Sequence, residues 1–247
     1  MFNINLKKNE AKIWFLGQSG FYIKSSGRSI IIDPYLSDSV GKATPGFSRL
    51  YPAPISVDEA KADIFIVTHD HLDHLDPETI SSYPYKEETT VVAPRHSAKK
   101  LTSLGIPIDN IIIIDHGDKK NIKGVDIEGI FALGTGADVV DTTGYRIEFE
   151  NGKNIYHTSD TAFCQLLIDV APTVDVLLPV INGKFGNLNA EQAVTLTRRV
   201  QPKYVIPQHF DMMALNSENP ETFRYFCEEA GIGSKCVILQ AVESLTW

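Results

Sequence analysis

Short apolar runs separated by turn residues dominate the first half of the chain and predict β-strands. The predicted strands of this half span residues 12–16, 21–24, 29–34, 63–67, 89–94 and 111–114. Gly and Ser turns join the first three strands into a meander, and a helical pattern over 97–104 ends at Gly105. Strands that alternate with helices in this way indicate a layered α/β architecture.

The second half of the chain adds hairpins and longer helices. Alternating apolar residues predict one hairpin over 121–131, and the Asn151-Gly152 turn predicts another over 145–157. Further strands are expected at 173–178, 203–207 and 236–239, and helices at 164–170, 189–200 and 220–230. We find no change in composition that marks a linker, so the sequence predicts a single domain over residues 1–247.

Composition narrows the classes of partner. The 247 residues carry a net charge of -8, with 43% hydrophobic and 22% charged residues, which are ordinary values for a soluble globular protein. An acidic chain without a basic patch is not expected to bind nucleic acid or an anionic membrane. We expect a cytoplasmic protein, because no stretch resembles a signal peptide or a membrane span and the three cysteines suit a reducing compartment.

Candidate chemistry concentrates in one stretch, from Thr68 to His74. It contains three imidazoles and two carboxylates within six residues. The stretch follows the apolar strand at 63–67, and Asp76-Pro77-Glu78 after it has the form of a helix start with Asp76 as the cap. Histidine is the commonest metal ligand at neutral pH, and so many donors predict two metal ions about 3.5–4 Å apart rather than one. The alternative is a solvated polar loop.

Three more polar residues come directly after predicted strands, and they are Asp33, Asp160 and His209. Groups beyond the ends of buried strands converge on one edge of a sheet, so Asp160 and His209 are expected to meet the metal loop. His157, which ends its own strand, is a further candidate for a ligand or a hydrogen-bond partner of one, and Asp33 is expected to bond towards the same loop. The alternatives are a helix cap for Asp160, a backbone-bonded buried imidazole for His209 and a turn acceptor for Asp33.

Taken together, these motifs resemble the metallo-β-lactamase fold of metal-dependent hydrolases. The residues that carry the resemblance are Leu16 to Phe21, Ile32 to Ser37, the His69-x-His71-x-Asp73-His74 pattern, Ser159-Asp160 and His209. The chain is more similar to the branch containing L-ascorbate-6-phosphate lactonase, through Thr68 to Pro77, Tyr156 to Asp160, Gly186 to Asn189 and Pro207 to Asp211. The resemblance covers nearly the whole chain and implies an α/β fold, a four-layer αββα sandwich.

The resemblance also implies a set of metal ligands. The first metal would take His69 and His71, the second would take Asp73, His74 and His209, and Asp160 would bridge them. The chain departs from the family at Ala132 to Gly136, where many members have another histidine. The first site would then be weaker, completed by water, or filled by Asp138 or His157, and the larger share of oxygen ligands would favour Mn2+ over Zn2+.

The implied activity is hydrolysis of a lactone or ester of a small phosphorylated sugar acid, in carbohydrate metabolism, by attack of metal-bound hydroxide. Asp73 would orient the nucleophile and handle its proton. Asn182 and Lys184 precede the helix expected at 189–200 and would cradle the anionic phosphate, although a flexible surface turn explains them equally well.

Three other functions stay open from the sequence: a metal-dependent phosphodiesterase of the same fold, a di-iron redox module, and a metal-binding protein without activity. His71 stands where the redox branch usually has Glu, and the acidic composition argues against an RNA substrate. The resemblance implies a homo-oligomer. Residues 35–55 are rich in Ser, Gly and Pro and long for a loop, so we expect a lid or an oligomer contact there.

Overall fold

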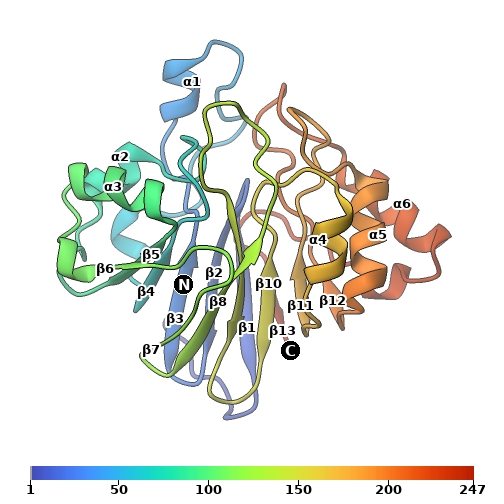
Figure 1. The fold of residues 1–247 in the computed structure, drawn as a ribbon, viewed down its shortest axis with the longest axis horizontal. Helices are drawn as coiled ribbons and strands as arrows, with labels where there is room; N and C mark the ends of the chain where they lie inside the picture. Colours follow the sequence, from blue (N-terminus) through green and yellow to red (C-terminus); the bar gives the residue numbers. More distant parts are fainter. Residues whose placement is uncertain (1) are drawn as a thin grey trace.

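Two β-sheets packed face to face form the centre of the protein, which a computed structural model describes over residues 2–247 (Figure 1). The first sheet has the spatial order β13-β1-β2-β3-β4-β5-β6. Its strands are β1 (Ala11–Gly17), β2 (Gly20–Ser25), β3 (Arg28–Ile32), β4 (Ile64–Ile66), β5 (Thr90–Ala93), β6 (Ile111–Ile113) and β13 (Ser244–Thr246). The second sheet has the spatial order β12-β11-β10-β9-β8-β7. Its strands are β7 (Lys119–Ile122), β8 (Val125–Phe131), β9 (Thr143–Glu148), β10 (Asn154–His157), β11 (Val176–Leu178) and β12 (Tyr204–Val205).

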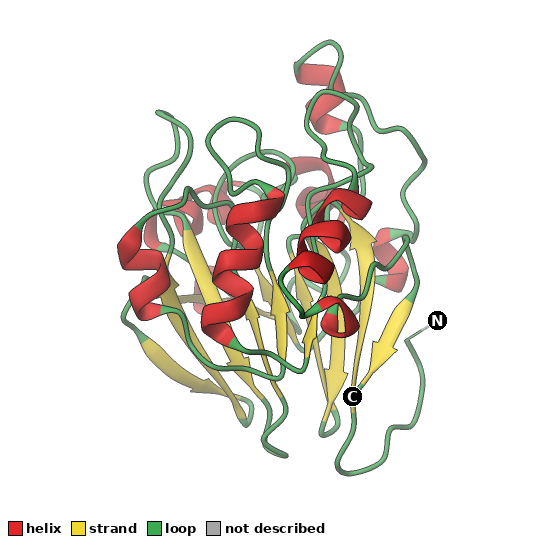
Figure 2. Cartoon of the chain, turned by 90° about the vertical axis from the view of Figure 1, so that its right-hand side faces the viewer, coloured by secondary structure: helices red, strands yellow, loops and turns green. Residues whose placement is uncertain are grey.

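Helices cover the outer face of each sheet (Figure 1 and Figure 2). On the first sheet lie α2 (Pro77–Ser82) and α3 (Arg95–Ser103), and on the second lie α4 (Gln165–Val170), α5 (Ala190–Val200) and α6 (Pro220–Glu229). The short α1 (Ser39–Ala43) stands above both sheets, and single 3-10 turns occur at Val57–Glu59, Ile108–Asn110 and Gly233–Lys235. The layer order of helix, sheet, sheet and helix confirms the predicted αββα sandwich.

The alternation of side chains along β1 shows how the layers are held together. Ile13 and Phe15 point into the core between the two sheets, whereas Trp14 and Leu16 point to the other face, into the cluster that α2 and α3 cover. All four side chains are buried. A strand with both faces buried reads as a continuous apolar run, which is the pattern that the sequence shows at 12–16.

Parallel pairing brings the ends of several strands to one side of the molecule. In the first sheet β3, β4 and β5 run parallel, and in the second sheet β10, β11 and β12 do the same. The loops that follow these strands lie at the upper end of the sheets in Figure 1, beneath α1. The polar residues predicted after the strands are therefore brought to a common edge.

The end of the chain differs from the sequence-based expectation. The strand predicted at 236–239 was wrong, because this segment makes only a single bridge, between Cys236 and Val205, beside the two-residue strand β12. The last strand is β13 instead, which pairs antiparallel with β1. Among residues 2–247, no helix is both long enough and apolar enough to cross a membrane.

Candidate metal centre

The loop from Val67 to Asp76 connects β4 to α2 and carries most of the candidate ligands. Its far end is fixed as the sequence predicts, since the Asp76 carboxylate accepts a hydrogen bond from the Glu78 N–H at 3.2 Å and Pro77 is the first helical residue. The middle of the loop is tied to α3, because the buried carboxylate of Asp70 forms an ion pair with Lys100. The loop is therefore held at both ends and at its centre.

A first group of donors consists of His69, His71 and Asp160, whose ligand atoms all lie within 4.8 Å of one another. His69 is fully buried, and its Nε2 lies 3.0 Å from Nδ1 of His71. The other nitrogen of the His69 ring lies 3.1 Å from the Thr68 hydroxyl and 3.3 Å from the Ser159 hydroxyl. These two hydroxyls fix the ring so that Nε2 faces the other donors.

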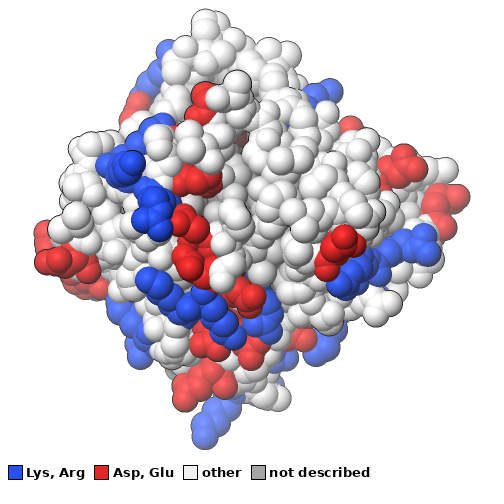
Figure 3. Space-filling view, in the orientation of Figure 1, with Lys and Arg blue, Asp and Glu red and all other residues white. Residues whose placement is uncertain are grey.

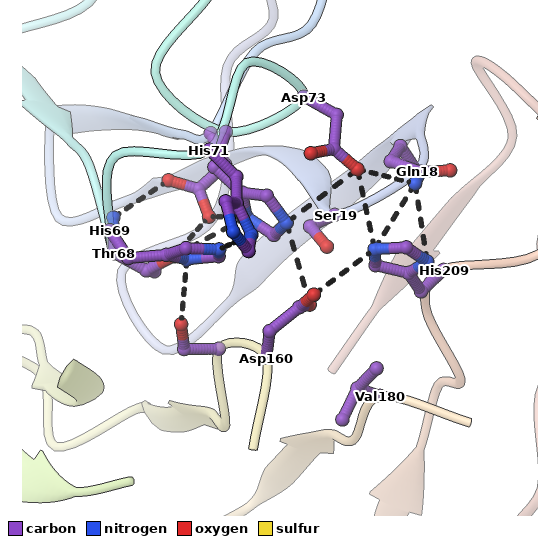
Figure 4. A network of polar contacts seen from close by, with 12 residues as sticks. Gln18, Ser19, Thr68, His69, His71, Asp73, Asp160, Val180 and His209 are labelled. Atoms are coloured by element: carbon purple, nitrogen blue, oxygen red, sulfur yellow. Dashed lines mark hydrogen bonds and ion pairs between the residues drawn. The ribbon is translucent and has the colours of Figure 1, made fainter. Parts of the chain in front are cut away.

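A second group consists of Asp73, His74 and His209, again with ligand atoms within 4.8 Å of one another. Asp160 lies between the two groups (Figure 4). Its Oδ1 is 3.4 Å from Nε2 of His74, and its Oδ2 is 3.4 Å from Nε2 of His209. The structure thus brings all six predicted ligands together, in the two sets that the resemblance implies and with Asp160 between them.

Charge alternates around the second group. Burial by itself lowers the pKa of His209, but the carboxylates of Asp160 and Asp73 outweigh it and raise that pKa to about 9. Burial also lowers the pKa of His74, yet Asp160, Asp73 and Asp33 together hold it well above its ordinary value. Burial raises the pKa of Asp73 and of Asp160, but the two imidazoles reverse this effect and hold both carboxyl pKa values below the usual range. These four side chains therefore form a network of paired charges.

Asp33 supports the centre from the end of β3. Its carboxylate accepts hydrogen bonds from the Thr68 N–H at 2.8 Å and the Thr68 hydroxyl at 2.6 Å. Its Oδ2 also lies 2.7 Å from Nδ1 of His74. The sequence left two roles open for Asp33, and these contacts are those of the first, a hydrogen bond towards the metal loop. The bond to His74 also orients its ring so that Nε2 faces Asp160.

His157 lies beside the centre without facing it. Its Nε2 is 3.0 Å from the carbonyl oxygen of Ser19, and its Nδ1 accepts a hydrogen bond from the Ser159 N–H at 3.1 Å. Burial lowers the pKa of this imidazole. Both ring nitrogens are occupied by backbone groups, so His157 holds the turn that carries Asp160 rather than offering a ligand atom. Asp160 does not cap the following helix, because the N-cap of α4 is Cys164.

The place of the missing histidine is occupied by a loop that approaches His71. Within it, Oδ1 of Asp138 lies 3.6 Å from Nε2 of His71, on the side of the ring away from His69, and the Asp138 side chain is 81% exposed. A Cβ added at Gly136 would lie 3.2 Å from the same nitrogen. Of the two residues expected to complete the first group, Asp138 is the one that reaches His71, and it does so at the outer nitrogen.

Sequence reasoning missed two residues that position the ligands. The fully buried Gln18 donates from Nε2 to Oδ2 of Asp73 at 2.7 Å, and this nitrogen lies 3.1 Å from both ring nitrogens of His209. Asn187 donates from Nδ2 to Oδ2 of Asp160 at 2.8 Å. Both residues lie in Gly-containing segments that carry the family resemblance, and this was the only signal for either of them.

The predicted phosphate cradle is not brought to the centre. Lys184 is exposed, and neither it nor Asn182 is among the residues that line the pocket over the donors. The Asn182 side chain is fully buried and donates to Asn216 at 2.6 Å. The N-terminus of α5 is occupied by its own capping box, in which Asn189 accepts a hydrogen bond from the Gln192 N–H. These contacts leave no cradle at this turn, so its role stays a prediction without structural support.

The donors suit divalent cations. In the part of the chain that the structure describes, Nε2 of His74 and Oδ1 of Asp160 are buried and face each other at 3.4 Å as an ion pair, and neither makes a hydrogen bond. Buried polar atoms without a partner are costly, and a cation between them would satisfy both. A mixed set of imidazole nitrogens and carboxylate oxygens suits Zn2+ and Mn2+. The centre opens on a pocket of about 320 Å3 whose floor includes His71, Asp73 and Asp160.

Comparisons with known proteins agree with this geometry. A family model described as a β-lactamase superfamily domain matches residues 12–209. The chain is 30% identical over 243 residues to a UPF0173 metal-dependent hydrolase from Pyrococcus furiosus, a match that covers 95% of this chain and 98% of the relative. It is also 26% identical over 223 residues to a UPF0173 metal-dependent hydrolase from Staphylococcus aureus, covering 86% and 91% of the two chains.

Solved structures show the same fold at lower sequence identity. One is Igni18, a metallo hydrolase from the archaeon Ignicoccus hospitalis, with a TM-score of 0.77 at 22% identity over 96% of this chain and 98% of that one. Another is an isothiocyanate hydrolase from Delia radicum gut bacteria, with a TM-score of 0.77 at 18% identity over 95% of this chain and 98% of that one. At this level of identity, the similarity to these structures shows the fold alone.

Proposed function

Because the chain belongs to the metallo-β-lactamase superfamily, among its UPF0173 metal-dependent hydrolases, we propose that it hydrolyses a lactone or carboxylic ester at the candidate metal centre. The observation that carries the proposal is the pair of donor groups, which meet at Asp160 on the floor of one pocket. Such a pair suits two cations that act on one bond.

The residues of the centre have two roles: some would bind the cations, and others position the side chains that do so. His69, His71 and Asp160 would hold one cation, and Asp73, His74 and His209 would hold the other together with Asp160. Bound there, Zn2+ or Mn2+ would supply a Lewis acid that lowers the pKa of water and polarises a carbonyl group. Asp33, Gln18 and Asn187 would keep the ligand atoms aimed at their positions, because each bonds to a ligand side chain.

We assign to Asp73 the role of orienting the attacking water. Its Oδ2 is engaged by Gln18, and Figure 4 shows its other oxygen pointing away from these contacts. The neighbouring imidazoles hold its pKa below the ordinary range, so the carboxylate is ionised at neutral pH. An ionised carboxylate at the pocket accepts a hydrogen bond from the attacking water and orients it, and its free oxygen is the atom available to the proton that leaves.

A phosphodiester is the competing substrate class, because the same pair of donor groups would serve it. The lactone is favoured by the resemblance to the lactonase branch and by the lining of the pocket. Among the described residues that line it there is no Lys or Arg to hold the charged oxygens of a phosphate, while Asp138 adds a further negative charge. A neutral carbonyl group meets no such repulsion.

The test is a substrate screen on the purified full chain loaded with Mn2+ or Zn2+. We expect turnover of γ-butyrolactone and p-nitrophenyl acetate in preference to bis(p-nitrophenyl) phosphate. His71→Ala and Asp73→Ala should each lower kcat/KM by about a hundredfold or more. The matched control is His116→Ala, which removes an exposed imidazole outside both donor groups and should leave the rate unchanged.

Two results would overturn the proposal. Turnover of the phosphodiester alone would replace lactone hydrolysis with the competing activity. Lactone hydrolysis that is equally fast in the wild type, His71→Ala and Asp73→Ala would show that the reaction does not use this centre.

A further inference from the structure

The pocket over the metal centre has an apolar mouth. Beyond the donors on its floor, the pocket is bordered by Val40, Phe47, Leu72 and Phe185. The remaining lining includes neutral hydrogen-bonding side chains such as Thr44 and Asn216 rather than cations. A volume of about 320 Å3 is at the small end of the range for small-molecule sites, so one ring or a short chain would fill it.

Two aromatic rings from distant segments meet at this mouth. The ring centroids of Phe47 and Phe185 are 5.9 Å apart, with an angle of 44° between the planes. Phe47 is half-buried and packs against the cluster of Tyr35, Met212 and Met213, which gives it a fixed base. Phe185 is 62% exposed. A single exposed ring is ordinary, but two that converge over a reactive centre form a site for an apolar group.

The backbone at Phe185 adds a second, independent observation. Phe185 has a φ of 52°, a left-handed conformation that is costly for a bulky residue. It lies between two glycines of positive φ, Gly183 and Gly186, in the loop before α5. A strained turn that holds a large apolar side chain out of the core is not explained by stability. Strain of this kind concentrates where a side chain is needed for binding.

Three cations on segments around the pocket have partners of their own. Lys42 pairs with Glu78 at 2.6 Å, and Lys100 pairs with Asp70. The Arg49 guanidinium donates to the backbone oxygens of Tyr35 and Tyr51. Figure 3 shows the Lys and Arg of this face gathered mainly to the left, below and at the right-hand side, with a largely uncharged surface over the upper loops. Lys184 lies next to Phe185 in the chain but does not line the pocket, so a phosphate inside the pocket would meet acids and apolar groups.

We propose that the substrate of this hydrolase carries an uncharged apolar group, aryl or alkyl, close to the scissile ester or lactone bond, and that Phe47 and Phe185 hold this group. The proposal rests on the proposed function for the reaction, while the binding of the apolar group is a property of the mouth alone. It replaces the phosphorylated sugar acid that the resemblance implies, since the pocket offers apolar surface where that substrate needs a cation.

The kinetic test uses γ-lactones whose alkyl chain lengthens from butyrolactone to nonalactone, with 6-phosphogluconolactone as the charged competitor. Each added methylene that enters the mouth should raise kcat/KM about three- to fourfold, until the pocket is full. Phe185→Ala and Phe47→Ala should flatten this dependence, mainly through KM. The control Tyr225→Ala, which removes an exposed aromatic ring from α6, should preserve the full dependence.

The binding test does not depend on turnover. Calorimetry with 4-phenylbutan-2-one, a neutral aryl ketone that cannot be hydrolysed, should show binding that Phe185→Ala weakens about three- to tenfold and that Tyr225→Ala does not change. Glucose 6-phosphate should bind more weakly than the ketone.

The outcomes separate the two proposals. If butyrolactone is hydrolysed but chain length has no effect, or the phosphorylated lactone is preferred, the apolar substrate is wrong and the hydrolase stands. If no lactone or ester is hydrolysed but the ketone binds through Phe185, the apolar site stands and the reaction is wrong. If the ketone does not bind and no lactone is hydrolysed, both proposals fall.

Discussion

Metal binding by this protein should tighten steeply as the pH rises from 7 to 9. The reason lies in His74 and His209, which lie among the carboxylates of the second donor group. In the metal-free protein, burial is outweighed by Asp160 and Asp73, and the pKa of His209 is raised to about 9. The pKa of His74 is also well above its ordinary value. A cation must therefore displace protons from both imidazoles at neutral pH.

The pKa of His209 sets the magnitude. At pH 7 only roughly a hundredth of this imidazole is unprotonated, so the apparent Kd for the cation should fall about tenfold for each pH unit up to 9. If His74 loses its proton in the same step, the dependence should approach about a hundredfold per unit.

The folding stability of the metal-free protein should change in the opposite direction and fall as the pH rises from 7 to 9. The folded pKa of His209 exceeds its ordinary value of 6.5, so its stabilising contribution is complete below pH 6.5 and is lost as the pH rises through 9. That contribution is roughly 3 kcal/mol. The lowered pKa values of Asp73 and Asp160 contribute stability above the ordinary value of 3.8, and this is lost as the pH falls below it. Without metal, the protein should be most stable at mildly acidic pH.

The assay is competition with a chromophoric chelator, corrected for the chelator's own protonation, for Zn2+ and Mn2+ between pH 6.5 and 9. Thermal unfolding of the metal-free and metal-loaded proteins over the same range gives the second readout, and the difference in Tm should widen as the pH rises. His116→Ala should keep the wild-type slope, because this exposed imidazole lies outside both groups. An affinity that stays constant between pH 7 and 9 would refute the reasoning, since it would mean that both histidines are already neutral.

The parts of the centre that the sequence predicts are those with local signals. The loop from Thr68 to His74 is recognisable because its donors are adjacent in the chain and because Asp76 and Pro77 mark the helix that follows. Asp160 and His209 are more distant, but each follows a strand, and parallel strands deliver their ends to one edge. The rule works here because the sheets are buried and their register is fixed by the core.

The rest depends on contacts between segments that carry no local pattern. Gln18 reaches Asp73 across 55 positions of the chain, and Asn187 reaches Asp160 across 27. An amide in a Gly-rich turn looks the same in the sequence whether it faces solvent or a carboxylate. The mouth of the pocket also has no local sequence pattern, because Phe47 and Phe185 come together only when the two halves of the chain pack.

Three further variants test the supports of the centre. Asp33→Asn leaves His74 and Thr68 without their shared carboxylate and should weaken metal affinity about 10- to 100-fold in chelator competition. Asp126→Asn, a half-buried carboxylate on β8 outside both donor groups, should not weaken it. Lys100→Met leaves the buried Asp70 charge without its main partner and should lower the free energy of unfolding in urea by about 1–3 kcal/mol. The control Lys99→Met, at the exposed neighbouring position, should lower it little. Equal losses in the two variants would mean that the ion pair does not fix the loop. Gln18→Leu removes the donor to Asp73 but also a buried oxygen without a partner, so metal affinity should fall about tenfold with little change in Tm, and a large loss of Tm would contradict this.

The backbone of the centre explains why these supports matter before any cation binds. Four residues at the centre, Gln18, Asp33, Ser159 and His209, have φ values of 53°, 41°, 61° and 68°, a conformation that non-glycine residues rarely adopt. Each such residue costs of order 1–3 kcal/mol, and such a conformation persists only where the surroundings impose it. Here the turns hold one another, since the His209 N–H donates to the Gln18 carbonyl oxygen at 2.7 Å and the Asp33 carboxylate accepts from the Thr68 N–H. The packed sheets and these turns thus position the donors, unlike a zinc finger, which folds around its ion, so we expect metal affinity in this protein to be set by proton displacement rather than by folding.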